Sequence, residues 1–127
     1  MSKLLVHLHL YYQDQTDYFI ERLSNITVPF KLIVTLTEDN ADVRRKLLSA
    51  VPDADILLVE NCGYDVYPFF QAMKHIDLSS YDYILKIHTK NSRNKLSLYW
   101  FLLVDIRLYI YYLLPYERLG YEDVSHL

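Results

Sequence analysis

The feature that most constrains the fold is an alternation of short apolar runs with stretches of helical period. Three stretches, in which apolar residues recur every three or four positions, separate four runs of strand length. Strands that alternate with helices of about 10–12 residues are typical of parallel sheets with right-handed crossovers. The sequence therefore predicts an α/β domain with an open, mainly parallel sheet of about four strands and helices on both faces. The four runs are residues 4–12, 30–36, 56–59 and 81–87.

Polar residues and one proline mark the expected helix starts. Thr16 is expected to cap the first helix with its hydroxyl group. Residues 37–40 are expected to form a turn and a cap before the second helix. Asp65 can cap the third helix, and Pro68 suits its first turn because the fixed φ of proline is compatible with a helix start.

Composition excludes several classes of function. A chain of 127 residues with 52% hydrophobic residues predicts one domain with a real core. The net charge of −3 gives no electrostatic reason to expect nucleic acid as a partner. The lone Cys62 excludes an internal disulfide and a zinc site of several cysteines, and it fits a reducing, cytoplasmic compartment. The basic triplet 44–46 could meet an anion, but a solvated helix face is favoured.

The last third of the chain is strongly apolar and aromatic. Residues 96–114 would nearly span a bilayer, but Asp105 and Arg107 near the middle are each costly in lipid. We therefore expect a helix packed in a core or an interface, ahead of a membrane-surface helix and of a spanning helix. The expected organisation is a ligand-binding α/β domain over residues 1–95, this helix over 96–115 and a tail over 116–127. The helix could serve a homodimer, dock onto a membrane-bound synthase or touch a membrane.

Chemistry-bearing residues follow the strands where their carboxyl ends would share one edge of the sheet. They are His9, Tyr11 and Tyr12; Thr35, Thr37 and Glu38; Asn61, Gly63 and Asp65; and His88, Thr89 and Lys90. A carboxylate in one loop and a cation in the neighbouring loop suit a nucleotide-sugar. Asp65 would accept hydrogen bonds from hydroxyl groups, and Lys90 would face the diphosphate.

Plainer interpretations stand beside these assignments. His7 and His9 on a strand fit buried, hydrogen-bonded histidines better than ligands. Residues 90–93 fit a solvated loop, and residues 60–70 fit a structural turn in which Gly63 permits a sharp bend. The sequence contains no Walker loop, no Gly-x-Gly-x-x-Gly fingerprint and no Gly-x-Ser-x-Gly elbow.

Two motifs in the right order resemble the rhamnan synthesis protein F family, whose members are implicated in bacterial surface polysaccharides such as rhamnan and lipopolysaccharide. The first is Asn61-x-Gly63-x-Asp65-x-x-Pro68-Phe69, and the second is the strand Tyr81–Ile87 running into His88-Thr89-Lys90. The segments 9–12 and 30–35 also fit the family's opening, so the similarity covers roughly residues 4 to 100.

The resemblance implies a GT-A-like glycosyltransferase fold that uses a nucleotide-diphosphate sugar as donor and a saccharide as acceptor. The implied donor site comprises His9, Tyr11, Thr37, Asn61, Gly63, Asp65, His88, Thr89 and Lys90. In such folds acidic residues at the end of the fourth strand hold a divalent metal against the diphosphate. Here His88-Thr89-Lys90 stands in that place, and a lysine would repel a metal and replace its charge. We therefore favour metal-independent binding without a resident cofactor, and a divalent metal is the less favoured alternative. The expected location is the cytoplasm, with the inner face of the membrane as a further option.

The chain departs from the family pattern at three positions of the first motif. Cys62 and Tyr64 replace arginines, and Tyr67 replaces a glycine. Two lost cations remove charge-assisted contacts to a phosphate, each worth about 1.5–3 kcal/mol. A glycosyltransferase of this class also continues with an acceptor half that carries the catalytic base, so the resemblance assigns no catalytic base within these 127 residues. A non-catalytic interaction module remains the alternative function.

Overall fold

A five-stranded sheet with the strand order β3-β2-β1-β4-β5 forms the centre of the computed structural model. The structure describes residues 3–63, 66–89 and 101–105. The first four strands are β1 (Leu4–His9), β2 (Phe30–Leu36), β3 (Asp55–Leu58) and β4 (Tyr83–His88), and their pairings are all parallel. The predicted α/β class and the mainly parallel sheet are confirmed.

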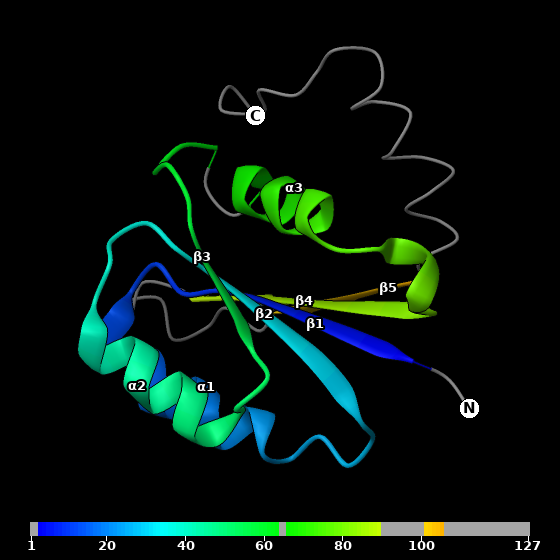
Figure 1. Ribbon diagram of the computed structural model, residues 1–127, viewed down its shortest axis with the longest axis horizontal. Coiled ribbons are helices and arrows are strands. Elements are labelled where there is room, and N and C mark those ends of the chain that lie inside the picture. Colours follow the sequence, from blue (N-terminus) through cyan, green and yellow to red (C-terminus); the bar gives the residue numbers. More distant parts are fainter. Residues whose placement is uncertain (1–2, 64–65, 90–100, 106–127) are drawn as a thin grey trace.

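Helices cover both faces of the sheet, as the alternating pattern predicts (Figure 1). The helices α1 (Thr16–Leu23) and α2 (Ala41–Ala50) lie side by side on one face. The helix α3 (Val66–His75) lies on the opposite face. Two short 3₁₀ turns, η1 (Gln13–Gln15) and η2 (Leu78–Ser80), precede α1 and β4. Within the part of the chain that the structure describes, no helix is long and apolar enough to cross a membrane.

The alternation of side chains along each strand produces two hydrophobic cores. On the face of α1 and α2, Val6 and Leu8 of β1 pack with Phe19, Leu23 and Leu47 of the helices. On the other face, Leu5 and Ile33 pack with Phe69, Phe70 and Met73 of α3. Because β1 is buried on both faces, its sequence is apolar apart from His7 and His9. Burying one such aliphatic or aromatic side chain contributes about 1.5–3 kcal/mol.

The helix starts only partly follow the sequence-based expectations. Asn40 caps α2, since its side-chain oxygen accepts hydrogen bonds from the backbone N–H groups of Asp42 and Val43. Thr16 does not cap α1, and that prediction is wrong. Gln15 occupies the N-cap position without a side-chain cap, and the Thr16 hydroxyl donates to the backbone oxygen of Gln13 at 2.6 Å. The preceding 3₁₀ turn moves Thr16 inside the helix and buries it.

The expected apolar C-terminal helix is wrong at the five residues of that segment that the structure describes. Residues Phe101–Asp105 form a fifth strand, β5, which pairs antiparallel with β4. A short apolar run cannot be assigned to helix or strand by periodicity alone, and the unpaired edge of β4 offers a full row of hydrogen-bonding groups. These residues therefore extend the sheet of the first domain. The rest of the predicted helix, and the tail over residues 116–127, lie outside the described residues.

Candidate functional site

The strand order places a topological switch point between β1 and β4. The chain runs outward from β1 through β2 to β3 and then returns to the other side of β1 for β4 (Figure 1). In open α/β sheets, the crevice outside the carboxyl ends of the strands at such a switch point is where ligands bind. Two hydrogen bonds join the loops here. The Thr89 N–H donates to the His9 oxygen at 3.1 Å, and the Tyr12 N–H donates to the Thr89 hydroxyl at 3.0 Å.

The register brings polar side chains together on the α3 face of the sheet near this crevice. His9 stands opposite Thr35 of β2 on one side and His88 of β4 on the other. His7 stands opposite Lys86, whose ammonium group lies 5.8 Å from the centre of the Phe69 ring. Sequence analysis did not assign Lys86 to the site. Its place two residues before His88, on the same face of β4, is the signal that could have done so.

One hydroxyl group links the two histidines of β1. The Thr35 Oγ1 atom lies 2.9 Å from His7 Nε2 and 2.9 Å from His9 Nδ1, and all three residues are buried. A hydroxyl has one proton, so it cannot donate to both rings, and at least one ring nitrogen must carry a proton. This arrangement agrees with the plainer interpretation of His7 and His9 as buried, hydrogen-bonded histidines. Thr35 was named as a strand-end residue but was not assigned to the donor site.

His88 is half-buried at the end of β4, and its hydrogen bond defines its tautomer. Its Nδ1 atom lies 3.1 Å from the backbone oxygen of Thr89. A carbonyl oxygen only accepts, so Nδ1 carries the proton in this contact. In the neutral ring, the other nitrogen, Nε2, is then an acceptor.

Tyr11 and Thr37 occupy the edge in different ways. Tyr11 follows β1 with 43% of its surface exposed, and its ring packs edge-on against Tyr12 with the centroids 4.9 Å apart. Its ring also lies 6.5 Å from that of His9. Thr37 is half-buried. It follows β2, which is the neighbour of β1, so it lies one strand away from the switch point between β1 and β4. An exposed aromatic ring beside the crevice provides a flat apolar surface for a sugar or a base.

The turn after β3 is built on Gly63. This buried residue has φ of 65°, which confirms the predicted sharp bend. Its carbonyl oxygen accepts from the N–H groups of Val66 at 3.0 Å and Tyr67 at 3.3 Å, so it satisfies two donors of the first turn of α3. Asn61 is exposed in the same turn, at the end of the outermost described parallel strand. Asp65 and Lys90 lie outside the described residues.

Of the predicted donor-site residues, the structure thus brings together His9, His88 and Thr89, with Tyr11 adjacent. Thr37, Asn61 and Gly63 lie at the same edge but one or two strands away. Among the described residues, no three His, Cys, Asp or Glu side chains lie together in a way that could hold a metal ion.

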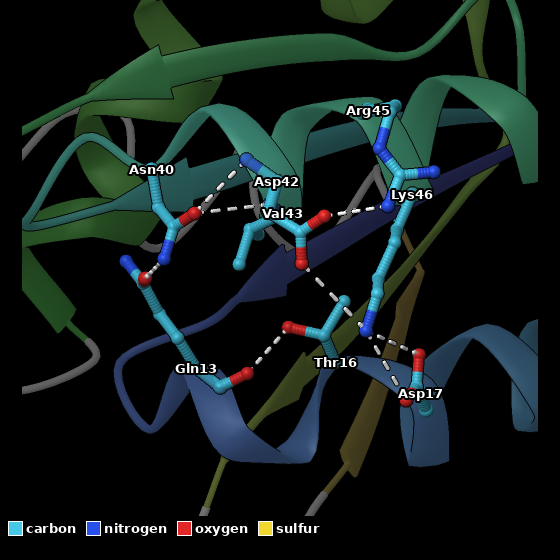
Figure 2. A network of polar contacts seen from close by, with 8 residues as sticks. All are labelled: Gln13, Thr16, Asp17, Asn40, Asp42, Val43, Arg45 and Lys46. Atoms are coloured by element: carbon cyan, nitrogen blue, oxygen red, sulfur yellow. Dashed lines mark hydrogen bonds and ion pairs between the residues drawn. The ribbon is translucent and has the colours of Figure 1, made fainter.

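A second feature of this edge is an open pocket between the starts of α1 and α2, with a volume of about 290 Å³ (Figure 2). Its polar groups bond to one another. Asn40 donates to the Gln13 side chain at 3.2 Å, and Gln13 donates to the Glu38 oxygen at 2.7 Å. Lys46 lies 3.3 Å from Asp17 and 3.9 Å from Asp42. The residues that line the pocket are Gln13, Asp14, Thr16, Asp17, Asn40, Asp42, Val43 and Lys46.

The basic triplet on α2 belongs to surface ion pairs. Hydrogen bonds from Arg44 and Arg45 lower the pKa values of Asp39 and Asp42, respectively. The Arg45 side chain is 67% exposed. These contacts agree with the solvated-face interpretation of residues 44–46. The hydrogen bonds of Gln13 with Glu38 and Asn40 join the loop after β1 to the loop after β2.

Comparison with known proteins gives one result. The family model described as rhamnan synthesis protein F matches residues 1–100. The match includes all four parallel strands, the three helices and every residue of the predicted donor site. Searches of curated proteins and of solved structures find no significant match.

Proposed function

Since the chain belongs to the rhamnan synthesis protein F family, and so has a role in making rhamnan polysaccharide, we propose that it is the donor-binding domain of a glycosyltransferase. The observation that carries the proposal is the strand order. It forms a switch point between β1 and β4, and loops rich in His, Tyr, Asn and Thr converge on that edge. The proposed ligand is a nucleotide-diphosphate sugar. The proposed transfer is of rhamnosyl or another hexosyl group to a saccharide acceptor.

Each residue has a distinct role in this proposal. Lys90 supplies the positive charge opposite the diphosphate, and Asp65 accepts hydrogen bonds from donor hydroxyl groups. His88 contacts the donor sugar, and its Nδ1 donates to the backbone oxygen of Thr89. Tyr11 provides an aromatic surface, and Asn61 and Thr37 border the site. The protein works on the cytoplasmic side of the membrane in this proposal.

A nucleotide-binding measurement tests the proposal. Thermal shift and calorimetry with uridine- and thymidine-linked sugars should show binding, because a ligand that binds the folded state raises its stability. Lys90→Ala should weaken binding at least about tenfold, the value of one charge-assisted contact, whereas Lys90→Arg should retain most of it. Lys74→Ala is the matched control, since Lys74 is exposed in the last turn of α3.

The role of Lys90 in place of a metal is tested by repeating the titration with a chelator. Unchanged affinity is expected if the lysine supplies the charge at the diphosphate. Loss of binding on chelation would contradict this part of the proposal and leave the donor site itself intact.

The alternative is a non-catalytic interaction module, which the apolar composition of residues 96–114 favours. In this alternative the segment binds a second copy of the chain or a synthase partner. A membrane surface is a third candidate for the surface that it binds. Light scattering during size exclusion discriminates the two functions when it is combined with the nucleotide screen. A stable dimer with no affinity for any donor would favour the module, and a monomer that binds a donor would favour the transferase domain.

A further inference from the structure

The pocket between the starts of α1 and α2 lies outside the donor site proposed above. Figure 2 shows that its polar side chains come from both helices and from the turn before α1. Its volume of about 290 Å³ is close to the lower end of the range typical of ligand pockets, about 300–1,000 Å³. A space of this size suits a single sugar unit and is small for a whole nucleotide-sugar.

The charges that line the pocket argue against an ion as its ligand. The lining has three carboxylates, from Asp14, Asp17 and Asp42, and one ammonium group, from Lys46. This excess of negative charge disfavours a phosphate, even beside the starts of two helices. The Lys46 Nζ atom lies 3.3 Å from Asp17 and 3.9 Å from Asp42, so two of the carboxylates already have a cation between them. A neutral, hydroxyl-rich ligand fits this lining better than either kind of ion.

The pocket holds hydrogen-bond donors in fixed places. The Asn40 oxygen accepts from the N–H groups of Asp42 and Val43, and its amide nitrogen donates to the Gln13 side chain. Gln13 in turn donates to the backbone oxygen of Glu38. A primary amide has two N–H donors, and the contacts within the described part of the chain engage one on each side chain. The second N–H of Asn40 and that of Gln13 are therefore left for a ligand.

Asp14 supplies acceptors to the same pocket. It is exposed in η1, and within residues 3–63, 66–89 and 101–105 no hydrogen bond or ion pair engages its carboxylate. The two carboxylate oxygens only accept, whereas the amide N–H groups only donate. A sugar hydroxyl does both, so neighbouring hydroxyl groups of one sugar can satisfy a carboxylate and an amide together.

The loop that carries Gln13 and Asp14 also reaches the crevice between β1 and β4. Tyr12 directly precedes Gln13, and its backbone N–H donates to the Thr89 hydroxyl at 3.0 Å. The Tyr12 side chain is exposed, and an aromatic ring offers a flat apolar face to the C–H groups of a sugar. The pocket and the proposed donor site thus share one loop. Sites for the two substrates of a transfer reaction have to lie close together.

We propose that the pocket between α1 and α2 binds one sugar unit of the saccharide acceptor. Asp14 accepts hydrogen bonds from hydroxyl groups of this unit, and the free N–H groups of Gln13 and Asn40 donate to its oxygens. Because the pocket is open to solvent, the bound unit can belong to a longer chain. The subsite holds the chain and takes no part in the chemistry. This inference rests on the proposed function, since an acceptor is defined by the transfer.

Titration of the ¹⁵N-labelled chain with a rhamnose trisaccharide tests the subsite. The backbone signals of residues 13–17 and 40–46 should shift, whereas uridine- and thymidine-linked sugars should shift signals at the ends of β1 and β4. Asp14→Ala should weaken trisaccharide binding roughly fivefold to tenfold, because a charged acceptor is lost, and should leave unfolding in urea unchanged. Asp53→Ala is the matched control, since Asp53 is exposed before β3 at the opposite edge of the sheet.

The outcomes separate the subsite from the donor site. No shift of the pocket signals with the trisaccharide, or equal affinities of Asp14→Ala and Asp53→Ala, would overturn the subsite even if nucleotide-sugars bind. Shifts of the same signals with inorganic phosphate or magnesium chloride, and not with the trisaccharide, would identify an ion site and overturn it too. Trisaccharide binding that depends on Asp14, without binding of any nucleotide-sugar, would overturn the donor proposal and support a saccharide site in this pocket.

Discussion

The Thr89 hydroxyl accepts a hydrogen bond from the Tyr12 backbone N–H at 3.0 Å, across the gap between the loops that follow β1 and β4. Thr89 is 6% exposed, and its own N–H donates to the backbone oxygen of His9 at the end of β1. The two bonds span 77 and 80 positions of the chain, counted from residues 12 and 9 to residue 89. Through these two hydrogen bonds, Thr89 connects the end of β4 to the end of β1 and to the loop that follows β1.

Thr89→Val should therefore destabilise the fold by about 1 kcal/mol, because the Tyr12 N–H loses its acceptor while the side-chain volume is kept. Urea denaturation with a constant slope measures the loss. Thr89→Ser keeps the hydroxyl group and should stay within a few tenths of a kcal/mol of the unaltered protein. Equal losses in both variants would show that the methyl group, and not the hydrogen bond, matters here.

Asn40→Ala should cost about 0.5–2 kcal/mol, because α2 loses the side-chain acceptor of two N–H groups. The measurement is again the free energy of unfolding in urea. Asn40→Asp is the control, since a carboxylate also caps and its charge suits the positive end of a helix. The Asn40→Asp variant loses only the hydrogen bond to Gln13, so it also measures how much the pocket network contributes to the free energy of unfolding. A loss in Asn40→Asp as large as that in Asn40→Ala would assign the effect to the network.

Gly63→Ala should cost about 1–2 kcal/mol, because a side chain with a Cβ atom is disfavoured at φ of 65°. Gly63→Asn separates conformation from size, since asparagine adopts this region more readily than alanine although it is larger. The order of stability should be glycine, then asparagine, then alanine. The reverse order of the two variants would point to crowding at this buried position instead.

The pH dependence of stability should have a component from Asp77. The side-chain hydrogen bond from Ser79, followed by the backbone N–H of Ser79, lowers the pKa of this carboxyl group below its usual value. A folded-state pKa below the unfolded value means that the contribution is present above pH 3.8 and is lost as the pH falls through the folded value. Asp77→Asn should therefore make the curve of stability against pH shallower as the pH falls below the usual range of a carboxyl group.

Salt distinguishes this contribution from that of the ion pairs. The pKa of Asp39 is lowered chiefly by its hydrogen bond with charged Arg44, whereas the partners of Asp77 are neutral serines. Raising the salt concentration to about 1 M should reduce the lowering of the pKa at exposed Asp39 and leave the lowering at Asp77 largely unchanged. Thermal unfolding of Asp39→Asn and Asp77→Asn at both salt levels measures the difference. An equal salt response in the two variants would contradict the assignment.

The parallel sheet could be predicted from the sequence because its signals are local. The run 4–12 carries apolar residues on both faces, as is typical of a central strand. Asn40 stands directly before a stretch whose apolar residues recur at helical spacing, where a cap is expected. Two local signals failed. The residues around the run 101–105 do not indicate whether it is a helix or a strand. The run forms a strand because it pairs with the edge of β4. At Thr16, the preceding 3₁₀ turn changed which residue begins the helix.

The site was predictable in outline and not in its contacts. That His9 and His88 share an edge follows from the alternation of strands and helices alone. The link from His9 to Thr35 joins residues 26 positions apart and depends on the register of β1 against β2, which no sequence pattern states. Asp65 and Lys90, which carry most of the proposed chemistry, remain predictions from the motifs.

The central place of β1 also imposes an order on folding. Its partner on one side, β2, follows within the next 27 residues, but its partner on the other side, β4, completes its register 79 residues after it. Contacts of such long separation form late, because the entropy of closing the loop must be overcome first. During synthesis, one edge of β1 stays unpaired until β4 leaves the ribosome. The pairing of these two strands thus completes the parallel part of the sheet, before β5 is added, and a chain that stalls before residue 88 would expose an apolar strand edge prone to aggregation.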